Sequence, residues 1–223
     1  TYLKYCEHLS ERIRKSSNIS QEVKVSQTLN VGEEVLNFFK NSGIDRNSMD
    51  HAESYISGVQ EVFRSFDPKK NGVLDEFVKD LASYEHGVAT VSIASLLTKE
   101  LGMNAHQALH IVGTAALVHD IGLMKMPEKF KEEDESKLSP EEIELYRTHP
   151  TVGAAELEKI PRIAGSIPQA VAHHHVRRNQ KGFPADVGGS QRNLISEVIG
   201  ISDDFAALIL RSKNDPSIQP IKE

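Results

Sequence analysis

The residues best able to do chemistry in this sequence are five histidines and two aspartates, found from position 86 onward. They are His86, His119, Asp120, His149, His174, His175 and Asp203. Iron, manganese, zinc and nickel all accept imidazole nitrogens and carboxylate oxygens as ligands. The adjacent His119 and Asp120 can place a nitrogen and a carboxylate near one metal, and a carboxylate can bridge two. So many ligands exceed what a tetrahedral zinc takes and suit two octahedral ions. The set predicts a two-metal site, and such sites commonly cleave phosphoesters.

Helices are expected to position these ligands, because apolar residues recur at three-to-four spacing and no convincing strand run is present. The predicted helices cover residues 31–39, 49–66, 74–101 with a bend near 84–87, 104–118, 167–175 and 194–210, and two short ones begin near 139 and 150. Gly43 and Gly102 are expected to end two of them, and Asn104 to cap the helix that delivers His119. The fold class is therefore predicted to be all-α.

Two segments are expected to be irregular. Residues 128–137 are polar and predict an exposed loop, and residues 177–192 carry glycines and prolines among basic side chains. Loops of the second kind often cover an active site, although most are simple connections.

Composition narrows the class of protein. The 223 residues are 39% hydrophobic, enough for a packed core, and the net charge of −6 does not favour a nucleic-acid polymer or a membrane surface. No apolar run is long enough to cross a bilayer. The single cysteine, Cys6, suits a reducing cytoplasm. The chain starts at Thr1 without a signal-peptide pattern, and its natural N-terminus is expected to lie upstream.

A boundary is expected near residues 67–73. It would separate an N-terminal helical region, 1–70, from a metal-binding domain, 71–223. The first region is either a regulatory or partner-binding module or a cap that completes the helical core, and both readings stay open.

Several short motifs stand in the order in which one family carries them. They are Glu85-His86-Gly87-Val88-Ala89, Ala115-Ala116-Leu117-Val118-His119-Asp120-Ile121-Gly122, His149-Pro150-Thr151-Val152-Gly153, His174-His175, Gly182-Phe183-Pro184 and Ile199-Gly200-Ile201-Ser202-Asp203. From His86 to about Leu208 the sequence resembles the HD-GYP family, a branch of the HD superfamily of metal-dependent phosphohydrolases. The resemblance covers a little over half of the chain.

The resemblance implies an all-helical domain with two central metals, iron favoured and manganese next. One metal would be held by His86, His119, Asp120 and Asp203. The other would be held by Asp120, His149, His174 and His175, so that Asp120 bridges. Some relatives hold a third metal through a glutamate at the position of Ala82, so two metals are expected here. The family usually hydrolyses cyclic diguanylate.

The departures from the family pattern concern residues around the metals. Leu123 stands where a lysine normally contacts the attacking water or the phosphate, and Lys125 is the candidate substitute. Phe183 replaces the tyrosine of Gly-Tyr-Pro. Val176 and Asn179 replace carboxylates, while Arg177 remains as a candidate phosphate ligand. Losing groups that orient metal ligands commonly costs about ten- to a hundredfold in affinity or rate.

Three functions follow from this pattern. The first is a metal-dependent phosphodiesterase acting on cyclic diguanylate or a related phosphoester, with Asp120 bridging, Lys125 as a catalytic candidate, and Arg177 and Phe183 contacting substrate. The second is a metal-dependent nucleotide sensor with little turnover that signals through a protein partner. The third is a phosphohydrolase of another nucleotide.

Overall fold

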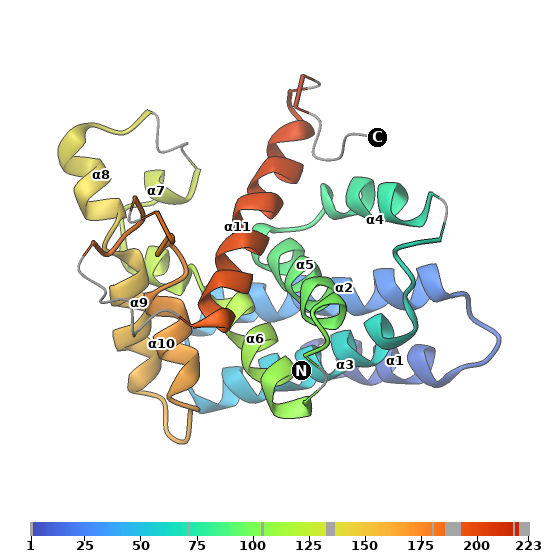
Figure 1. The fold of residues 1–223 in the computed structure, drawn as a ribbon. Coiled ribbons are helices and arrows are strands. Elements are labelled where there is room, and N and C mark those ends of the chain that lie inside the picture. The colour runs from blue at the N-terminus through green and yellow to red at the C-terminus, as the bar shows by residue number, and fades with distance from the viewer. Residues whose placement is uncertain are drawn as a thin grey trace.

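The protein is described by a computed structural model that covers residues 2–70, 72–103, 105–132, 137–179, 181–185, 193–215 and 217–218. Within these ranges every regular element is a helix, which confirms the all-α prediction (Figure 1). None of the described helices is long and apolar enough to cross a membrane.

The first half of the chain forms a layer of helices, all of them long except α4, which has nine residues. These are α1 (Tyr2–Lys15), α2 (Gln21–Ser42), α3 (Arg46–Ser65), α4 (Val73–Leu81), α5 (His86–Glu100) and α6 (His106–Val118). The Ser20 side chain caps α2, and Gly43 ends it with a φ of 78°, as predicted. Asp45 and Ser48 form a capping box that starts α3.

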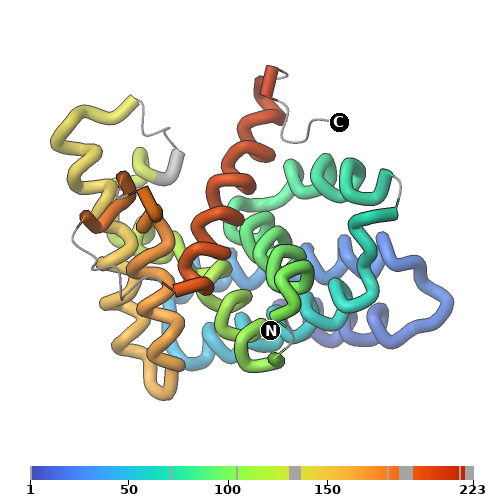
Figure 2. The backbone as a smooth tube through the Cα atoms, viewed as in Figure 1, coloured from blue at the N-terminus to red at the C-terminus, as the bar shows by residue number. Residues whose placement is uncertain are grey.

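The second half carries shorter elements around one long helix. These are η1 (Ile121–Lys125), α7 (Lys129–Glu132), α8 (Pro140–Tyr146), α9 (His149–Glu158), α10 (Ser166–Ala172) and α11 (Leu194–Ser212). Helix α11 packs on α5 and α6 and touches α10, which pairs with α9. The tube in Figure 2 shows α11 rising between the α9–α10 pair and the layer of long helices. The predicted helix starts at Ser139 and Pro150 and the helix at 194–210 are confirmed.

The prediction of one bent helix over 74–101 is wrong, because the structure has two separate helices there, α4 and α5. Glu85 is extended, with φ −65° and ψ 153°. Its backbone N–H donates to Glu33 Oε1 at 2.6 Å, and its carboxylate accepts from Lys40 Nζ at 2.6 and 2.8 Å. Both contacts tie Glu85 to α2 at the point where the backbone leaves the helical conformation, and α5 starts at His86.

Three smaller expectations also need correction or lie outside the described residues. The helix predicted over 167–175 ends at Ala172, so His174 and His175 follow it. The His174 ring donates a hydrogen bond to the Val171 carbonyl in its last turn. The loop predicted at 128–137 contains α7, and Phe130 in it is buried. Asn104 lies outside the described residues, and the residue before α6 is Ala105.

Apolar side chains from both halves join one core. It includes Leu29 and Phe39 from α2, Ile56 from α3, Leu157 from α9 and Ile199 from α11. A smaller cluster joins Leu123, Phe130 and Leu138 beside the main core. The division at residues 67–73 stays a prediction.

Candidate metal centre

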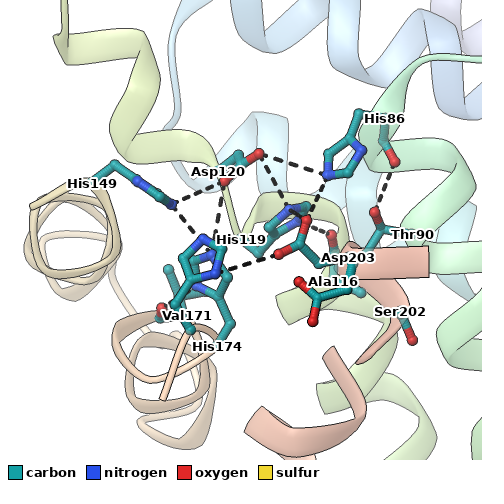
Figure 3. A network of polar contacts seen from close by, with 12 residues as sticks. His86, Thr90, Ala116, His119, Asp120, His149, Val171, His174, Ser202 and Asp203 are labelled. Atoms are coloured by element: carbon teal, nitrogen blue, oxygen red, sulfur yellow. Dashed lines mark hydrogen bonds and ion pairs between the residues drawn. The ribbon is translucent and has the colours of Figure 1, made fainter. Parts of the chain in front are cut away.

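The predicted ligands come together from six elements or their ends (Figure 3). His86 opens α5, His119 follows α6, Asp120 precedes η1, His149 opens α9, His174 and His175 follow α10, and Asp203 lies within α11. Their ligand atoms form three overlapping groups, in each of which the atoms lie within 4.8 Å of one another. The groups are Asp120 with His149, His174 and His175, then His86 with His119 and Asp120, then His119 with His174 and Asp203.

Asp120 stands between two sets of histidines. Its Oδ1 lies 3.2 Å from His149 Nε2 and 3.8 Å from His174 Nε2. Its Oδ2 lies 3.3 Å from His119 Nε2 and 3.9 Å from His86 Nε2. One carboxylate therefore presents a separate oxygen to each set, which is the geometry a bridging ligand needs.

Asp203 closes the cluster from α11. Its Oδ1 lies 2.9 Å from His86 Nε2 and 3.7 Å from His119 Nε2, and its Oδ2 lies 3.6 Å from His175 Nδ1. Asp203 thus contacts histidines of both expected sets.

Three of the histidines are oriented by backbone carbonyls. The Nδ1–H of His119 donates to Ala116 O at 2.7 Å, and that of His174 donates to Val171 O at 2.7 Å. His149 does the same with Tyr146 O at 2.8 Å. In each case the carbonyl lies three residues earlier, in the last turn of a helix, where carbonyls lack a partner within the helix. These bonds leave Nε2 unprotonated in the neutral ring and point its lone pair at the cluster.

The donor set fits divalent cations. His149 Nε2 and His174 Nε2 lie 3.3 Å apart, and both rings already use Nδ1–H on a carbonyl. Two lone pairs that face each other repel unless a cation or a proton lies between them. His119 Nε2 is also buried without a hydrogen-bond partner among the described residues. Cations bound in the overlapping groups would satisfy these three nitrogens. Mixed nitrogen and oxygen donors suit iron, manganese, nickel or zinc.

The side chains of the cluster differ in solvent exposure, so it has a buried side and an exposed side. The side chains of His119, His149 and His174 are at most 1% exposed, whereas those of His86 and Asp120 are 28% and 33% exposed. A ligand from solvent therefore meets Asp120 and His86 first.

The charges of the cluster shift its pKa values in opposite directions. Burial alone would lower the pKa of His119, but the charges of Asp120 and Asp203 outweigh it and raise this pKa well above its usual range. Burial opposes ionisation of both aspartates, yet the neighbouring histidines hold their pKa values well below the usual range. Burial lowers the pKa of His175 to about 3. The buried His174 shifts in the same direction, with His175 and His119 adding to the effect of burial.

Glycines of the sequence motifs lie against the carbonyls of ligand histidines. A Cβ added to Gly122 would lie 2.0 Å from His149 O, and one added to Gly200 would lie 2.2 Å from His174 O. Only glycine lets the backbones approach so closely. These glycines therefore fix the separation between the ligand-bearing segments.

Phe183 covers one side of the histidine cluster. Its ring centroid lies 4.3 Å from that of His175 and 5.9 Å from that of His149. Its backbone N–H donates to His175 O at 3.1 Å, so the turn that carries the ring is tied to the paired histidines. Arg147 lies over the Phe183 ring, with its guanidinium carbon 5.6 Å from the ring centroid.

Arg177 is held by protein groups. One guanidinium nitrogen donates to His174 O at 2.7 Å, and another donates to the Asp204 carboxylate at 2.8 and 2.9 Å. In this arrangement Arg177 ties the paired-histidine turn to α11 beside Asp203.

Lys125 lies outside the groups of metal-ligating atoms. Its side chain is 59% exposed, and Nζ lies 3.7 Å from Glu156 Oε2. Leu123, which stands at the family's lysine position, is buried with Phe130 and Leu138.

The sequence did not reveal two parts of the site. These are the backbone carbonyls that orient the histidine rings and the side chains that contact Arg177 and Phe183. The carbonyls that orient the rings could have been anticipated from histidines placed at helix ends. Asp204 and Arg147 carried no signal, because an exposed aspartate and an exposed arginine have no distinctive spacing.

Comparison with protein families places the same segment in a known group. The HD domain family model matches residues 75–221, about two thirds of the chain. Bd1817, an HDG"Y"P protein from Bdellovibrio bacteriovorus, has a similar fold, with a TM-score of 0.69 and 16% identity over 94% of this chain and 68% of that one.

Curated relatives match over a similar region. The cyclic di-GMP phosphodiesterase PA4108 of Pseudomonas aeruginosa is 28% identical over 58% of this chain and 31% of its own length. The 3'3'-cGAMP-specific phosphodiesterase 1 of Vibrio cholerae is 29% identical over 68% of this chain and 34% of its own. The cyclic di-GMP phosphodiesterase response regulator RpfG of Xanthomonas campestris is 26% identical over 59% and 32%. The matches thus span about a third of each of these relatives.

Proposed function

The chain belongs to the HD domain family, whose members bind divalent metals, and on that premise we propose that it is a metal-dependent phosphodiesterase of a cyclic dinucleotide. The observation that carries the proposal is the position of Asp120, whose two oxygens face different histidines at 3.2 and 3.3 Å. The names of the relatives support a cyclic dinucleotide as the substrate class, with cyclic diguanylate as the first candidate.

We assign the ligands to two cations. His86, His119, Asp120 and Asp203 would hold one, and Asp120, His149, His174 and His175 would hold the other. Bound there, two divalent cations would neutralise phosphodiester charge and lower the pKa of water near the scissile bond. The mixed donors allow iron or manganese, and iron is the first choice by resemblance.

The chain's own residues position and shield the reaction. The carbonyls of Ala116, Tyr146 and Val171 keep three imidazoles turned toward the cluster. Phe183 packs on the His175 ring and would shield that face of the imidazole from water. The partly exposed Asp120 and His86 mark the side from which the phosphodiester would approach.

Lys125 is our candidate proton donor to the leaving oxygen. Its tie to Glu156 is long, at 3.7 Å, and largely exposed, so releasing the amine costs little. Arg177 could contact phosphate only by giving up bonds to Asp204 or His174 O, and we assign it a positioning role first.

A second candidate function is a nucleotide sensor with weak turnover. The observation that favours it is that Arg177, expected to contact substrate, and Lys125, the catalytic candidate, both lie beside carboxylates. Leu123, at the position of the usual lysine, is buried. Such a protein would bind the nucleotide through its metals and signal through a partner. A phosphohydrolase of another nucleotide remains the third candidate.

Turnover and binding measured on one preparation test the proposal. Anaerobically purified protein is incubated with cyclic diguanylate, 3'3'-cGAMP and GMP, and the products are separated by chromatography. We expect a linear dinucleotide or mononucleotide from a cyclic dinucleotide, and none from Asp120→Ala. Binding of cyclic diguanylate without product would favour the sensor, and turnover of GMP alone would favour the third function.

A further inference from the structure

A cavity lies between α3, α5 and α6, at the ends of α5 and α6 that are remote from the candidate metal centre. Its volume is about 400 Å³, within the range of small-molecule sites, which is about 300–1,000 Å³. Phe63 and Leu109 give it an apolar part, and Gln60 contributes an amide to its wall. The Gln60 nitrogen is buried and has no hydrogen-bond partner among the described residues.

The cavity is separate from the candidate metal centre. Lys99 lines the cavity in the last turn of α5, whereas His86 opens the same helix. His106 lines it at the start of α6, whereas His119 follows the end of that helix. At 1.5 Å per residue, each of these helices carries the chain about 20 Å from the cavity to the metal ligands.

The charge of the cavity wall is opposite to that of the whole chain. Arg64, Lys99 and His106 line it, and among the described residues no aspartate or glutamate does. The chain as a whole carries a net charge of −6. Basic groups gathered in a concave site concentrate anions there.

Lys99 is fixed in place by the end of α3. Its Nζ donates to Phe63 O at 3.2 Å and also to Phe66 O. These carbonyls carry no formal charge, so Lys99 keeps a net positive charge at the cavity wall, although the negative end of the α3 dipole offsets part of it. Arg64 comes from the last turn of α3, and its planar guanidinium can bind two phosphate oxygens at once.

We propose that this cavity binds a small phosphomonoester whose organic part is apolar or aromatic. Arg64, Lys99 and His106 would hold the phosphate, and Phe63 and Leu109 would contact the organic part. This site does not depend on the proposed phosphodiesterase activity.

The test is a residue-resolved NMR titration of the full chain with phenylphosphonate, which carries a phosphate-like group and a ring but has no ester bond to hydrolyse. Ionic strength is kept constant. We expect saturable shifts of the backbone amides of Phe63, Ser95 and Leu109. Inorganic phosphate or benzyl alcohol alone should bind more weakly, because each lacks one half of the ligand.

Charge variants separate this site from general attraction of anions. Arg64→Gln should weaken phenylphosphonate binding at these amides about tenfold or more, the usual effect of losing a charged hydrogen bond. Arg12→Gln is the matched control, since Arg12 is an exposed arginine in the last turn of α1, and it should change nothing.

Any of three outcomes would overturn the proposal. One is the absence of saturable shifts around the cavity, and another is equal weakening by the Arg64 and Arg12 substitutions. Shifts confined to the surroundings of His119 and His149 would also reject the second site, while leaving the phosphodiesterase proposal intact.

Discussion

Nε2 of His149 lies 3.2 Å from Oδ1 of Asp120, and the other oxygen of that carboxylate faces a different pair of histidines. The His149 ring cannot turn away without losing its bond to Tyr146 O. Asp120 is therefore flanked by rings whose lone pairs already point at it, which is how preorganised metal sites are built.

Close backbone approach makes Gly200 sensitive to substitution. A Cβ there would lie 2.2 Å from His174 O and 2.7 Å from an Arg177 nitrogen. We expect Gly200→Ala to lower the free energy of unfolding by about 1–3 kcal/mol, the usual cost of overpacking, and to weaken metal binding. Urea unfolding and metal analysis of the same sample measure both. Gly165→Ala is the control, because nothing lies within 4 Å of its added Cβ, and equal effects of the two substitutions would contradict the argument.

The Arg177–Asp204 pair is expected to position the paired histidines. The two side chains are 31% and 60% exposed, so the pair itself contributes no more than about 1 kcal/mol. Arg177→Gln should cost more than Asp204→Asn, because it also loses the bond to His174 O. A double-mutant cycle in urea should show coupling of about 0.5 kcal/mol. A higher KM for cyclic diguanylate in Arg177→Gln with unchanged stability would instead assign Arg177 to phosphate binding.

The lowered pKa of His175 predicts acid sensitivity of the metal-free protein. In the unfolded chain this histidine takes up a proton near pH 6.5, but in the folded chain it does so only at about pH 3. Between these values the unfolded state binds more protons, so the free energy of unfolding falls as pH falls. From pH 7 to pH 5 this group alone should remove about 2 kcal/mol.

Urea unfolding of chelator-treated protein at both pH values checks this expectation. His175→Gln should reduce the difference between pH 7 and pH 5, while substitution of the exposed His8 by Gln should leave it unchanged. An equal pH dependence in the wild type and His175→Gln would show that another group is responsible. The raised pKa of His119 acts in the opposite sense, with stability lost as pH rises above about 6.5.

Substitution of Lys125 tests whether its amine serves as the proton donor in place of the lysine that the family carries at the position of Leu123. If its amine serves the leaving oxygen, Lys125→Gln should lower kcat about a hundredfold or more with little change in KM, the usual share of general acid catalysis. Glu156→Gln frees the amine from its 3.7 Å partner and should not lower kcat. An unchanged kcat in Lys125→Gln, measured with cyclic diguanylate, would remove Lys125 from the mechanism.

The sequence was most informative where the physical signal was local. Gly43 ends α2, and Ser139 with Glu142 caps α8, because these effects depend on neighbouring residues. The local sequence indicated a bend near 84–87, but the structure has a full break there. At this break Glu85 contacts Glu33 and Lys40, which lie more than forty positions away and could not be identified from the local pattern.

The candidate site shows the same division. Motif order picked out candidate ligands, and the structure brings their ligand atoms into groups within 4.8 Å of one another. The roles expected for Arg177 and Lys125 depended on where long, flexible side chains point. Arg177 contacts Asp204, and Lys125 lies 3.7 Å from Glu156, and these neighbours are brought together only once the helices are packed.

Metal content of anaerobically purified protein, measured as ions per chain in the wild type and in Asp120→Ala, tests the central claim most directly. Asp75→Ala, an exposed aspartate in the first turn of α4, is the control. If Asp120 bridges two cations, the wild type and the control carry two per chain and Asp120→Ala carries one or none. A single ion in the wild type, or two retained without Asp120, would contradict the binuclear account.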